Sequence, residues 1–399
     1  MKILYVALNQ SYKAKHAGFT HVYNVARAFQ KRGHEVQVAL KPGGADRKKG
    51  ATFQEDGLVY HLEDWSALIV NLPRFIISFI SALGKVRRWK KECGLDLIYE
   101  RYELTRTHFG IIGKLLGIPT LLEVNIPILE VRFGKKKVLY KILKIFQKAH
   151  FSLYQGLITQ TESLKNILQD DFKKEIVVVP NGADPQLFKP QPRSDEKRAD
   201  LGLGQEERVI GFVGSFMPWH GLQDLVDAFE IVCQKDNSVR LLVIGGSRDQ
   251  IGQLIEGNRD KRALKKIIFL GEIDYPLIPA YLDLCQVLVA PFNTKRDEGR
   301  RKLYDKYGFW WCPIKLFEYM AMARPVVVSD VGEITAYLDG AGLTYREGDT
   351  RGLAESILRL LNNLEESSRM GERGRRLILE KYSWELHARR IEQILTALA

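Results

Sequence analysis

The feature that most constrains the fold of this chain is the regular alternation of short apolar runs with segments of helical periodicity. Lys2–Leu8 predicts a first strand, residues 20–32 predict a helix that Gly33 ends, and Val36–Leu40 predicts a second strand. Such a strand–helix–strand unit is typical of a parallel sheet. The alternation continues to residue 179 and begins again at residue 209. We therefore expect an α/β protein with two doubly wound domains in succession.

A proline-rich, charged stretch separates the two alternating runs. Residues 185–206 contain Pro185, Pro190 and Pro192, a composition typical of a linker. We assign residues 1–190 to a first domain, 191–206 to a linker, 207–383 to a second domain and 384–399 to a closing helix. Ligands of doubly wound sheets bind at the carboxyl ends of strands, and two such domains offer a cleft between them.

Basic residues are concentrated in the first half of the chain. Residues 1–190 contain 30 Lys and Arg against 17 Asp and Glu, a net charge of +13, whereas the remainder has a net charge of −1. This asymmetry indicates an anionic partner for the first half. The four cysteines of the 399 residues show no metal-ligand spacing, so we expect a reducing compartment and no disulfide framework.

Two segments of the basic half are candidates for membrane contact. The most apolar stretch, 68–83, is interrupted by Asn71, Pro73 and Arg74, so it does not predict a membrane span, and the first residues do not form a signal peptide. We expect a cytoplasmic protein, peripheral at the inner face of a membrane through residues 68–91 and 132–148.

The second of these segments has the composition of a membrane-surface helix. An apolar stripe is flanked by six lysines; the stripe is Val138, Ile142, Ile145 and Phe146, and the lysines are Lys135, Lys136, Lys137, Lys141, Lys144 and Lys148. The alternative is an ordinary amphipathic helix docked on its own sheet. The basic charge of the surrounding half favours the membrane interpretation.

Two glycine-containing turns follow predicted strands of the second domain. Gly214 and Ser215 stand between a strand and a helix, where exposed backbone N–H groups attract phosphate. Gly246 follows the next strand in the same way. Each turn either approaches a phosphate or serves as a plain strand-to-helix connection. The charged run 295–302 is likewise either a solvated loop or a set of cations that closes over a polyphosphate.

The stretch 312–330 contains a short apolar helix with one carboxylate, Glu318, before a buried strand at 326–328. A lone acid on such a helix needs a partner because an unpaired buried charge is costly. The residues alone leave two partners open, a structural cation or a ligand hydroxyl.

The order of motifs along the chain resembles family 4 of the retaining glycosyltransferases, which have the GT-B fold. The matching segments are KHAG at 15–18, DLIYERYE at 96–103, LLEVN at 121–125, TQTESLKNIL at 159–168, VVVPNGADPQLF at 177–188, GFVGSFMPWHGLQDLVDAF at 211–229, VIGG at 243–246, PIKLFEYMAMARPVVVSDVGEI at 313–334 and YSWE at 382–385. The resemblance implies two Rossmann-like domains that face each other across a cleft, with the C-terminal helix crossing back to the first domain.

The resemblance also implies roles for individual residues. The donor is a nucleoside diphosphate sugar, and Glu318 accepts hydrogen bonds from its ribose hydroxyls. Backbone N–H groups at Ile314 and Lys315 hold the diphosphate, and Gly18 allows a close approach to the same phosphates. The turns at Gly214, Ser215 and Gly246 complete the donor-binding set. The fold usually works without a metal, so neither a metal nor another cofactor is expected.

The chain departs from the family pattern at several positions. Trp310 stands eight residues before Glu318, where the family has its earlier acid. The basic pair of the first glycine loop is replaced by Ser215 and His220, so His220 and Lys315 are assigned to the diphosphate as catalytic residues, with help from Lys295 or Arg296. Arg101 and Asn125 stand where family members often have histidine, and Arg101 is a third candidate catalytic residue near the acceptor or the transferred sugar.

These observations predict a retaining glycosyltransferase. We expect it to move a hexose from a UDP- or GDP-sugar to a glycan or lipid-linked acceptor in surface polysaccharide or glycoconjugate assembly. The alternatives are another GT-B activity, such as a sugar-nucleotide epimerase or a phosphorylase, an inactive family member, and a non-enzymatic protein that binds anionic ligands. No nucleic-acid motif with interleaved aromatic residues is present, so we expect no nucleic-acid partner.

Overall fold

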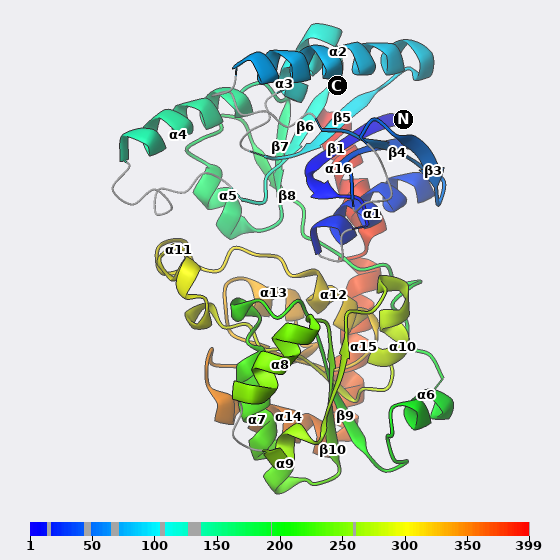
Figure 1. Ribbon diagram of the computed structural model, residues 1–399, viewed down its shortest axis with the longest axis vertical. Helices are drawn as coiled ribbons and strands as arrows, with labels where there is room; N and C mark the ends of the chain where they lie inside the picture. The colour runs from blue at the N-terminus through cyan, green and yellow to red at the C-terminus, as the bar shows by residue number, and fades with distance from the viewer. Residues whose placement is uncertain are drawn as a thin grey trace. The chain divides into compact units, whose positions relative to one another are not determined.

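The chain forms two compact units. The computed structural model describes residues 1–13, 17–43, 49–64, 72–103, 108–126, 137–192, 194–257 and 261–398. The first unit comprises Met1–Pro180 together with Trp384–Ala399, and the second comprises Asn181–Ser383. Each unit is built on its own sheet with helices packed around it (Figure 1).

The first unit contains an eight-stranded sheet in the order β3-β4-β2-β1-β5-β6-β7-β8. Its strands are β1 (Lys2–Ser11), β2 (Glu35–Lys41), β3 (Thr52–Glu55), β4 (Leu58–Leu62), β5 (Leu97–Arg101), β6 (Thr120–Glu123), β7 (Gly156–Thr159) and β8 (Ile176–Val178). Only the pairing of β3 with β4 is antiparallel among these strands. The central strands are buried on both faces, as expected of a parallel sheet covered by helices.

Six helices cover this sheet: α1 (Ala17–Lys31), α2 (Leu72–Cys93), α3 (His108–Leu116), α4 (Lys137–Phe151), α5 (Glu162–Leu168) and α16 (Trp384–Leu398). The last of these, α16, lies beside α1 although it comes from the other end of the chain (Figure 1). Arg32 Nε donates to Glu392 Oε1 at 2.6 Å, and His34 Nε2 lies 2.6 Å from the same oxygen. The C-terminal helix is therefore part of the first unit.

The second unit contains a six-stranded sheet in the order β11-β10-β9-β12-β13-β14, and all its pairings are parallel. Its strands are β9 (Arg208–Val213), β10 (Val239–Ile244), β11 (Ile267–Gly271), β12 (Val287–Ala290), β13 (Val326–Ser329) and β14 (Gly342–Tyr345). Phe212, Phe229 and Val243 are fully buried in its core. Two parallel-sheet α/β units thus confirm the predicted fold class.

The helices of the second unit are α6 (Asp195–Asp200), α7 (Leu222–Lys235), α8 (Arg248–Gly257), α9 (Lys261–Leu264), α10 (Ile278–Leu282), α11 (Arg301–Tyr307), α12 (Ile314–Ala321), α13 (Ile334–Leu338), α14 (Thr350–Asn362) and α15 (Leu364–Glu380). Four 3₁₀ turns complete it: η2 (Pro218–His220), η3 (Tyr275–Leu277), η4 (Thr294–Arg296) and η5 (Glu298–Arg300). In the described ranges, no helix is long and apolar enough to cross a bilayer.

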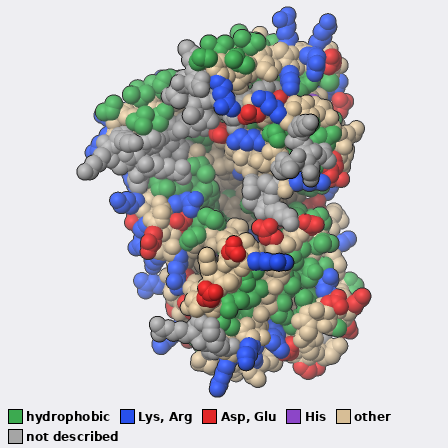
Figure 2. Space-filling view, viewed as in Figure 1, with side chains coloured by type: hydrophobic (Ala, Val, Ile, Leu, Met, Phe, Trp, Pro, Cys, Tyr) green, Lys and Arg blue, Asp and Glu red, His purple; other side chains and the backbone are tan. Residues whose placement is uncertain are grey.

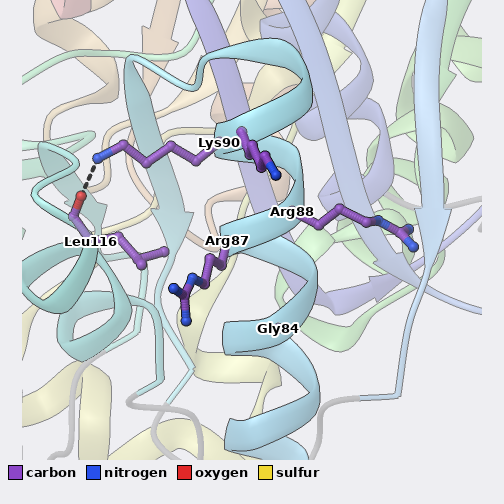
Figure 3. Close-up of a pocket in the computed structure, with 6 residues that line it drawn as sticks. Gly84, Arg87, Arg88, Lys90 and Leu116 are labelled. Atoms are coloured by element: carbon purple, nitrogen blue, oxygen red, sulfur yellow. Dashed lines mark hydrogen bonds between the residues drawn. The ribbon is translucent and has the colours of Figure 1, made fainter.

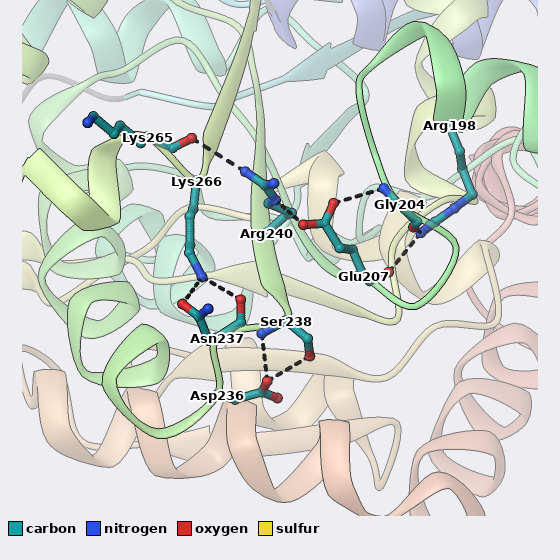
Figure 4. Close-up of polar contacts among 9 residues, drawn as sticks. All are labelled: Arg198, Gly204, Glu207, Asp236, Asn237, Ser238, Arg240, Lys265 and Lys266. Atoms are coloured by element: carbon teal, nitrogen blue, oxygen red, sulfur yellow. Dashed lines mark hydrogen bonds and ion pairs between the residues drawn. The ribbon is translucent and has the colours of Figure 1, made fainter.

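The segment expected to be a linker is folded against the second unit. Ser194 caps helix α6 by accepting from the Lys197 N–H, and Arg198 is buried, with its guanidinium donating to the Glu207 carbonyl at 2.8 Å. Glu207 accepts in turn from Arg240 Nε at 2.7 Å (Figure 4). The second unit begins at Asn181, so this segment belongs to it, and the first domain predicted to end at residue 190 ends earlier in the structure.

Several further elements differ from the sequence expectation. The hairpin β3–β4 and helix α15 were not predicted, and α1 begins at Ala17, three residues before the predicted start, so that Gly18 lies in its first turn. The charged run 295–302 forms η4, η5 and the start of α11. Asn293, just before the run, and Asp297, within it, cap the two turns, so short local hydrogen bonds order a segment that has no apolar periodicity.

Candidate active site

The candidate site of the second unit lies where the direction of its strand order reverses. The chain builds the sheet outward from β9 to β11 and then returns to place β12 on the other side of β9. Helices that follow β9 and β12 leave the sheet in opposite directions, which opens a crevice at the carboxyl ends of these strands. Gly214 follows β9 directly, and α12 is the helix that leads from the β12 side into β13.

The loop after β9 has a constrained backbone. Gly214 N–H donates to the Ile244 carbonyl at 2.9 Å, and Phe216 has a positive φ of 53°, a strained value for an aromatic residue. Gly221 has φ 68°, and a Cβ there would lie 1.6 Å from the Pro291 carbonyl oxygen. Only glycine is therefore compatible with this close approach, which sets the position of η2 and of His220 at its end.

Three of the predicted residues come together at this loop. A Cβ on Gly214 would lie 2.8 Å from Lys315 Nζ and 3.0 Å from His220 Nδ1, so the bare glycine leaves room for both nitrogen atoms. Lys315 Nζ is buried and lies 4.8 Å from the ring centre of Phe212 and 5.4 Å from that of Phe292. Neither nitrogen has a hydrogen-bond partner among the described residues.

Burial controls the protonation of this cluster. Loss of water around the Lys315 ammonium lowers its pKa from 10.5 to about 7, and the nearby Glu318 carboxylate opposes this change. Burial, and then the proximity of Lys315, lower the pKa of His220 well below its ordinary value. His220 is therefore neutral near pH 7. Lys315, with a pKa of about 7, is only partly protonated there and would gain a proton on binding an anion. A buried ammonium without a hydrogen-bond partner destabilises the folded protein, and such groups are often found at functional sites.

The N-terminus of α12 adds backbone donors beside Lys315. The residue before the helix, Pro313, makes no side-chain capping hydrogen bond, and the first turn contains no acidic residue. The first N–H groups of a helix have no partner within it, and the helix dipole favours a negative charge at this end. Ile314 is buried at the first position, so its backbone N–H and that of Lys315 stand at the end of the helix where the ammonium lies.

Glu318 lies one turn further along α12 and is only 5% exposed. Its Oε1 accepts a hydrogen bond from Tyr275 Oη at 2.6 Å. Burial raises the pKa of Glu318 to about 7, although the Tyr275 hydrogen bond and the Lys315 charge act in the opposite direction. Among the residues that the structure describes, no three His, Cys, Asp or Glu side chains are grouped so that they could hold a metal ion. A tyrosine hydroxyl is thus the partner that the structure gives this acid.

The remaining predicted donor residues lie around this cluster with different surroundings. Ser215 is exposed immediately after Gly214. Gly246 has φ 77° and packs against Phe216, since a Cβ there would lie 2.6 Å from the ring; the glycine serves the turn at this point. Gly245, one residue earlier, abuts the Gly214 carbonyl in the same way.

Two further positions of this loop region differ from what the sequence suggested. Trp310, which stands at the position of the missing acid, is 1% exposed and packs with Tyr304 and Trp311 at ring-centre distances of 5.8 and 5.3 Å. Arg296 donates from its Nε and Nη2 to Asp224 Oδ1 at 2.9 and 2.6 Å. The tryptophan is therefore a core residue, and Arg296, which the sequence suggested for the diphosphate, has Asp224 as a partner in the structure.

The first unit has its own buried polar cluster at the carboxyl ends of β5 and β6. Its centre is Glu123, which is fully buried and accepts hydrogen bonds from Tyr99 Oη at 2.6 Å and Gln160 Nε2 at 2.7 Å. His21 Nε2 lies 3.0 Å from the carboxylate. Burial raises the pKa of Glu123, but His21 and Arg101 outweigh it and hold the pKa well below the ordinary value. This carboxylate is fully paired.

Arg101, the predicted catalytic residue of the first unit, ends β5 within this cluster. Its Nη1 lies 3.8 Å from Glu123 Oε1. With the Asn125 amide turned to suit its neighbours, the amide oxygen accepts from Arg101 Nε at 2.5 Å and the amide nitrogen donates to Glu123 Oε1 at 2.9 Å. Gly18, the other predicted residue of this unit, packs against the side chain of Gln10.

Sequence reasoning missed Glu123 and His21 as members of a site, and it missed Tyr275. Glu123 stood in the motif LLEVN and is a lone acid in a buried strand, the same signal that singled out Glu318. His21 and Tyr275 carry no local signal, because their partners lie 102 and 43 residues away in the chain.

Comparison with known proteins agrees with this architecture. Residues 18–187 match the family model described as Glycosyltransferase Family 4, and residues 207–363 match the one described as Glycosyl transferases group 1. Between them the two matches cover most of both units. The chain belongs to glycosyltransferase family 4. It is a GT-B enzyme that transfers a glycosyl group, and the predicted family and fold are confirmed.

The chain is also similar to individual proteins from several organisms. It is 27% identical over 297 residues to an uncharacterized glycosyltransferase of Methanocaldococcus jannaschii, covering 73% of this chain and 72% of the relative. It is 26% identical over 293 residues to the capsular polysaccharide biosynthesis glycosyltransferase CapM of Staphylococcus aureus, with coverages of 69% and 70%. The structure of Anabaena HepE in complex with UDP and glucose aligns over the whole length of both chains with a TM-score of 0.71 at 16% identity, which shows a common fold.

Proposed function

We propose that this family 4 enzyme is a retaining hexosyltransferase that takes its sugar from UDP- or GDP-hexose. The observation that carries the proposal is the buried Lys315 ammonium, which has no hydrogen-bond partner among the described residues and lies beside Gly214 and His220 at the start of α12. A diphosphate would supply the negative charge that this ammonium lacks, and the free N–H groups of the helix start would add hydrogen bonds. The UDP bound to the structurally similar HepE supports a nucleotide ligand.

Glu318 is the proposed ribose ligand. It lies on the same helix as Lys315, about one turn further on, so a diphosphate at the helix start would have its nucleoside directed along the helix. A ribose diol offers two hydroxyl donors to one carboxylate. Those hydroxyls would join the Tyr275 hydroxyl around Glu318 and favour its ionised form.

The proposed reaction proceeds on one face of the sugar. The bond between the anomeric carbon and the β-phosphate oxygen breaks, and the acceptor oxygen forms its bond to that carbon on the same side. The acceptor proton passes to the departing phosphate oxygen, so the products are a glycoside and a nucleoside diphosphate. Lys315 and the α12 N–H groups stabilise the charge that develops on the leaving group, and no metal is required in this proposal. Neutral His220 donates or accepts one hydrogen bond at the phosphate and adds no charge.

The acceptor is proposed to be a glycan or a lipid-linked glycan in surface polysaccharide or glycoconjugate assembly. The similarity to a capsular polysaccharide enzyme supports this class. We place the reaction in the cytoplasm, at the inner face of a membrane that presents the acceptor. In the first unit, Arg101 and Asn125, which pair with the fully buried Glu123, are the proposed contacts for the acceptor or the transferred sugar.

The test is a thermal-shift screen with UDP-, GDP- and ADP-hexoses, followed by a transfer assay with the sugar that binds. A ligand that binds the folded state raises the melting temperature by mass action. We expect a shift with a UDP- or GDP-sugar that is lost in Glu318→Ala. Turnover of the nucleotide sugar to an epimer without any acceptor would replace the proposal with an epimerase activity, and unchanged nucleotide affinity in Glu318→Ala would remove the assignment of the site.

A further inference from the structure

Helix α4 turns its apolar residues away from the protein. It is held by three buried residues, Gln147, His150 and Phe151. The apolar residues Val138 and Ile145 are 73% and 67% exposed, and Leu139, Ile142 and Phe146 are 43–47% exposed. At 3.6 residues per turn, these five side chains lie on the face opposite to the buried one. The alternative of an amphipathic helix docked on its sheet through this stripe is therefore wrong.

Helix α2 repeats this arrangement in the same unit. Its buried side is formed by Ala82, Val86 and Trp89, whereas Ile77 and Ile80 are 69% and 61% exposed near its start. Figure 2 shows hydrophobic side chains gathered over both helices. Burying such side chains is favourable, and so many outward apolar residues on two helices indicate an apolar partner that the described chain does not supply.

Basic residues accompany both apolar faces. Within α4 every charged residue is a lysine, apart from His150, and Lys137, Lys141 and Lys148 are exposed on one flank of the apolar face. Helix α2 contains six Lys and Arg and a single acid, Glu92. Of its basic residues, Arg87, Arg88, Lys90 and Lys91 are exposed in the half of the helix after the isoleucines. In a dimer formed through this surface, the lysines of one copy would face the lysines of the other. The charge therefore selects an anionic apolar partner over self-association.

A shallow basic groove lies at the second half of α2. It is lined by Gly84, Arg87, Arg88, Lys90, Lys91 and Leu116, and Lys90 Nζ donates to the Leu116 carbonyl (Figure 3). Arg88 pairs loosely with Glu92 at 3.8 Å. Arg87 and Lys91 make no ion pair or hydrogen bond with the residues that the structure describes. Such a groove suits the phosphate of a lipid headgroup.

We propose that the outward faces of α2 and α4 form a membrane-docking surface for an anionic bilayer. The surface consists of the exposed apolar residues of the two helices and the basic residues that flank them. The apolar side chains enter the boundary between headgroups and acyl chains, and the lysines and arginines contact the headgroup phosphates. This inference extends the proposed function by naming the partner surface. The two segments that the sequence predicts for membrane contact begin at residues 68 and 132; residues 68–71 and 132–136 lie outside the described residues.

The test is co-sedimentation of the full chain with vesicles, without nucleotide. One vesicle is phosphatidylcholine alone, and the other is an equal mixture of phosphatidylcholine and phosphatidylglycerol. We expect binding to the mixed vesicles only, weakened by salt. The double variant Val138→Ser/Ile145→Ser should lose roughly tenfold or more in affinity, and Lys137→Glu/Lys141→Glu should lose roughly tenfold.

Matched controls come from the second unit. Leu364 is 73% exposed, the same fraction as Val138, so Leu364→Ser removes an equally exposed apolar side chain outside the docking surface. Lys235, exposed at the end of α7, provides Lys235→Glu as the charge control. Both controls should bind vesicles like the wild type.

Three results would overturn the proposal: equal binding to neutral and anionic vesicles, unchanged binding of the α4 variants, or a dimer that Val138→Ser/Ile145→Ser dissociates in light scattering. Nucleotide-induced thermal shifts of the same variants separate this proposal from the enzymatic one. If the shifts are absent in every variant and in the wild type while vesicle binding persists, only the proposed function fails.

Discussion

Two buried carboxylates of this chain have opposite electrostatic surroundings. Glu123 in the first unit has His21 and Arg101 beside it, and its pKa lies well below the ordinary value. Glu318 in the second unit lies near the Tyr275 hydroxyl and near Lys315, whose ammonium is itself desolvated. Burial raises the pKa of Glu318 to about 7. The first carboxylate is part of a completed network, whereas the second lies near an ammonium that has no hydrogen-bond partner among the described residues, where we propose that a ligand binds.

The largest expected effect is on stability, from Glu123→Ala. The variant leaves His21 and Arg101 buried without a counter-charge, which we expect to cost about 3–5 kcal/mol in the free energy of unfolding. Because the folded pKa is depressed, the stabilisation by Glu123 is present above its unfolded pKa and is lost as the pH falls through the folded value. Urea unfolding at pH 7 measures the loss.

The matched variant Glu318→Gln should behave in the opposite way. The folded pKa of Glu318 is raised to about 7, so the ionised carboxylate opposes folding above the unfolded pKa and most strongly above pH 7. At pH 8 we expect the glutamine variant to be as stable as the wild type or more stable. A loss as large as that of Glu123→Ala would show that the two carboxylates do not differ as described.

Next in size is the effect of Lys315→Met on nucleotide binding. The charged hydrogen bonds that this ammonium makes to a diphosphate are worth about 1.5–3 kcal/mol, roughly ten- to a hundredfold in affinity. The variant should keep or gain stability in the free state, because it removes a buried ammonium. The exposed Lys235 at the end of α7 provides the control, and Lys235→Met should bind like the wild type.

The pH dependence of nucleotide binding gives a third comparison. An anionic ligand favours protonated Lys315, whose free pKa is about 7, so affinity should fall up to tenfold per pH unit above pH 7. Ribose hydroxyls favour ionised Glu318, whose free pKa is also about 7, so affinity should fall below pH 7 as well. Calorimetry across pH 5.5–8.5, a range of about three units around the two pKa values, should give a maximum near neutrality. Lys315→Met should flatten the alkaline side and Glu318→Gln the acid side; an unchanged profile in both would contradict the assignment.

The smallest effect is expected from Tyr275→Phe. It removes the hydrogen bond that lowers the pKa of Glu318, so the acid side of the binding profile should move to higher pH. We expect a loss of about 1 kcal/mol in stability at pH 8 and little change at pH 5, where the carboxyl is protonated. Denaturation at the two pH values measures the difference, and an equal loss at both would place the tyrosine in packing alone.

The sequence predicted the fold well because most strands and helices have their own local pattern of apolar residues. Strands such as Val326–Ser329 are short apolar runs, and helices such as Thr350–Asn362 have an apolar stripe. The hairpin at Thr52–Glu55 was not predicted because its half-buried, mixed residues lack a clear alternation. Caps at Ser194 and Asp297 order segments that composition alone describes as loops.

The site was predictable in part, for a related reason. Glu318 and Lys315 lie on one short helix, so their spacing was visible in the sequence, and Gly214 stood at the end of a predicted strand. Their proximity to His220, the burial of Trp310 and the pairing of Arg296 with Asp224 depend on how distant segments pack. The sequence also did not determine whether the apolar stripe of α4 is exposed, since an amphipathic pattern does not say which face packs on the protein.

The most direct test of the central claim is calorimetric titration of UDP and GDP into the wild type and Lys315→Met. If the start of α12 holds the diphosphate, the folded variant binds the preferred nucleotide at least roughly tenfold more weakly than the wild type at pH 7. At pH 8, where Lys315 is mostly deprotonated and Glu318 mostly ionised, the wild type takes up protons on binding and the variant does not. Equal affinity of the two proteins at pH 7, or binding by the wild type at pH 8 without proton uptake, would contradict the account.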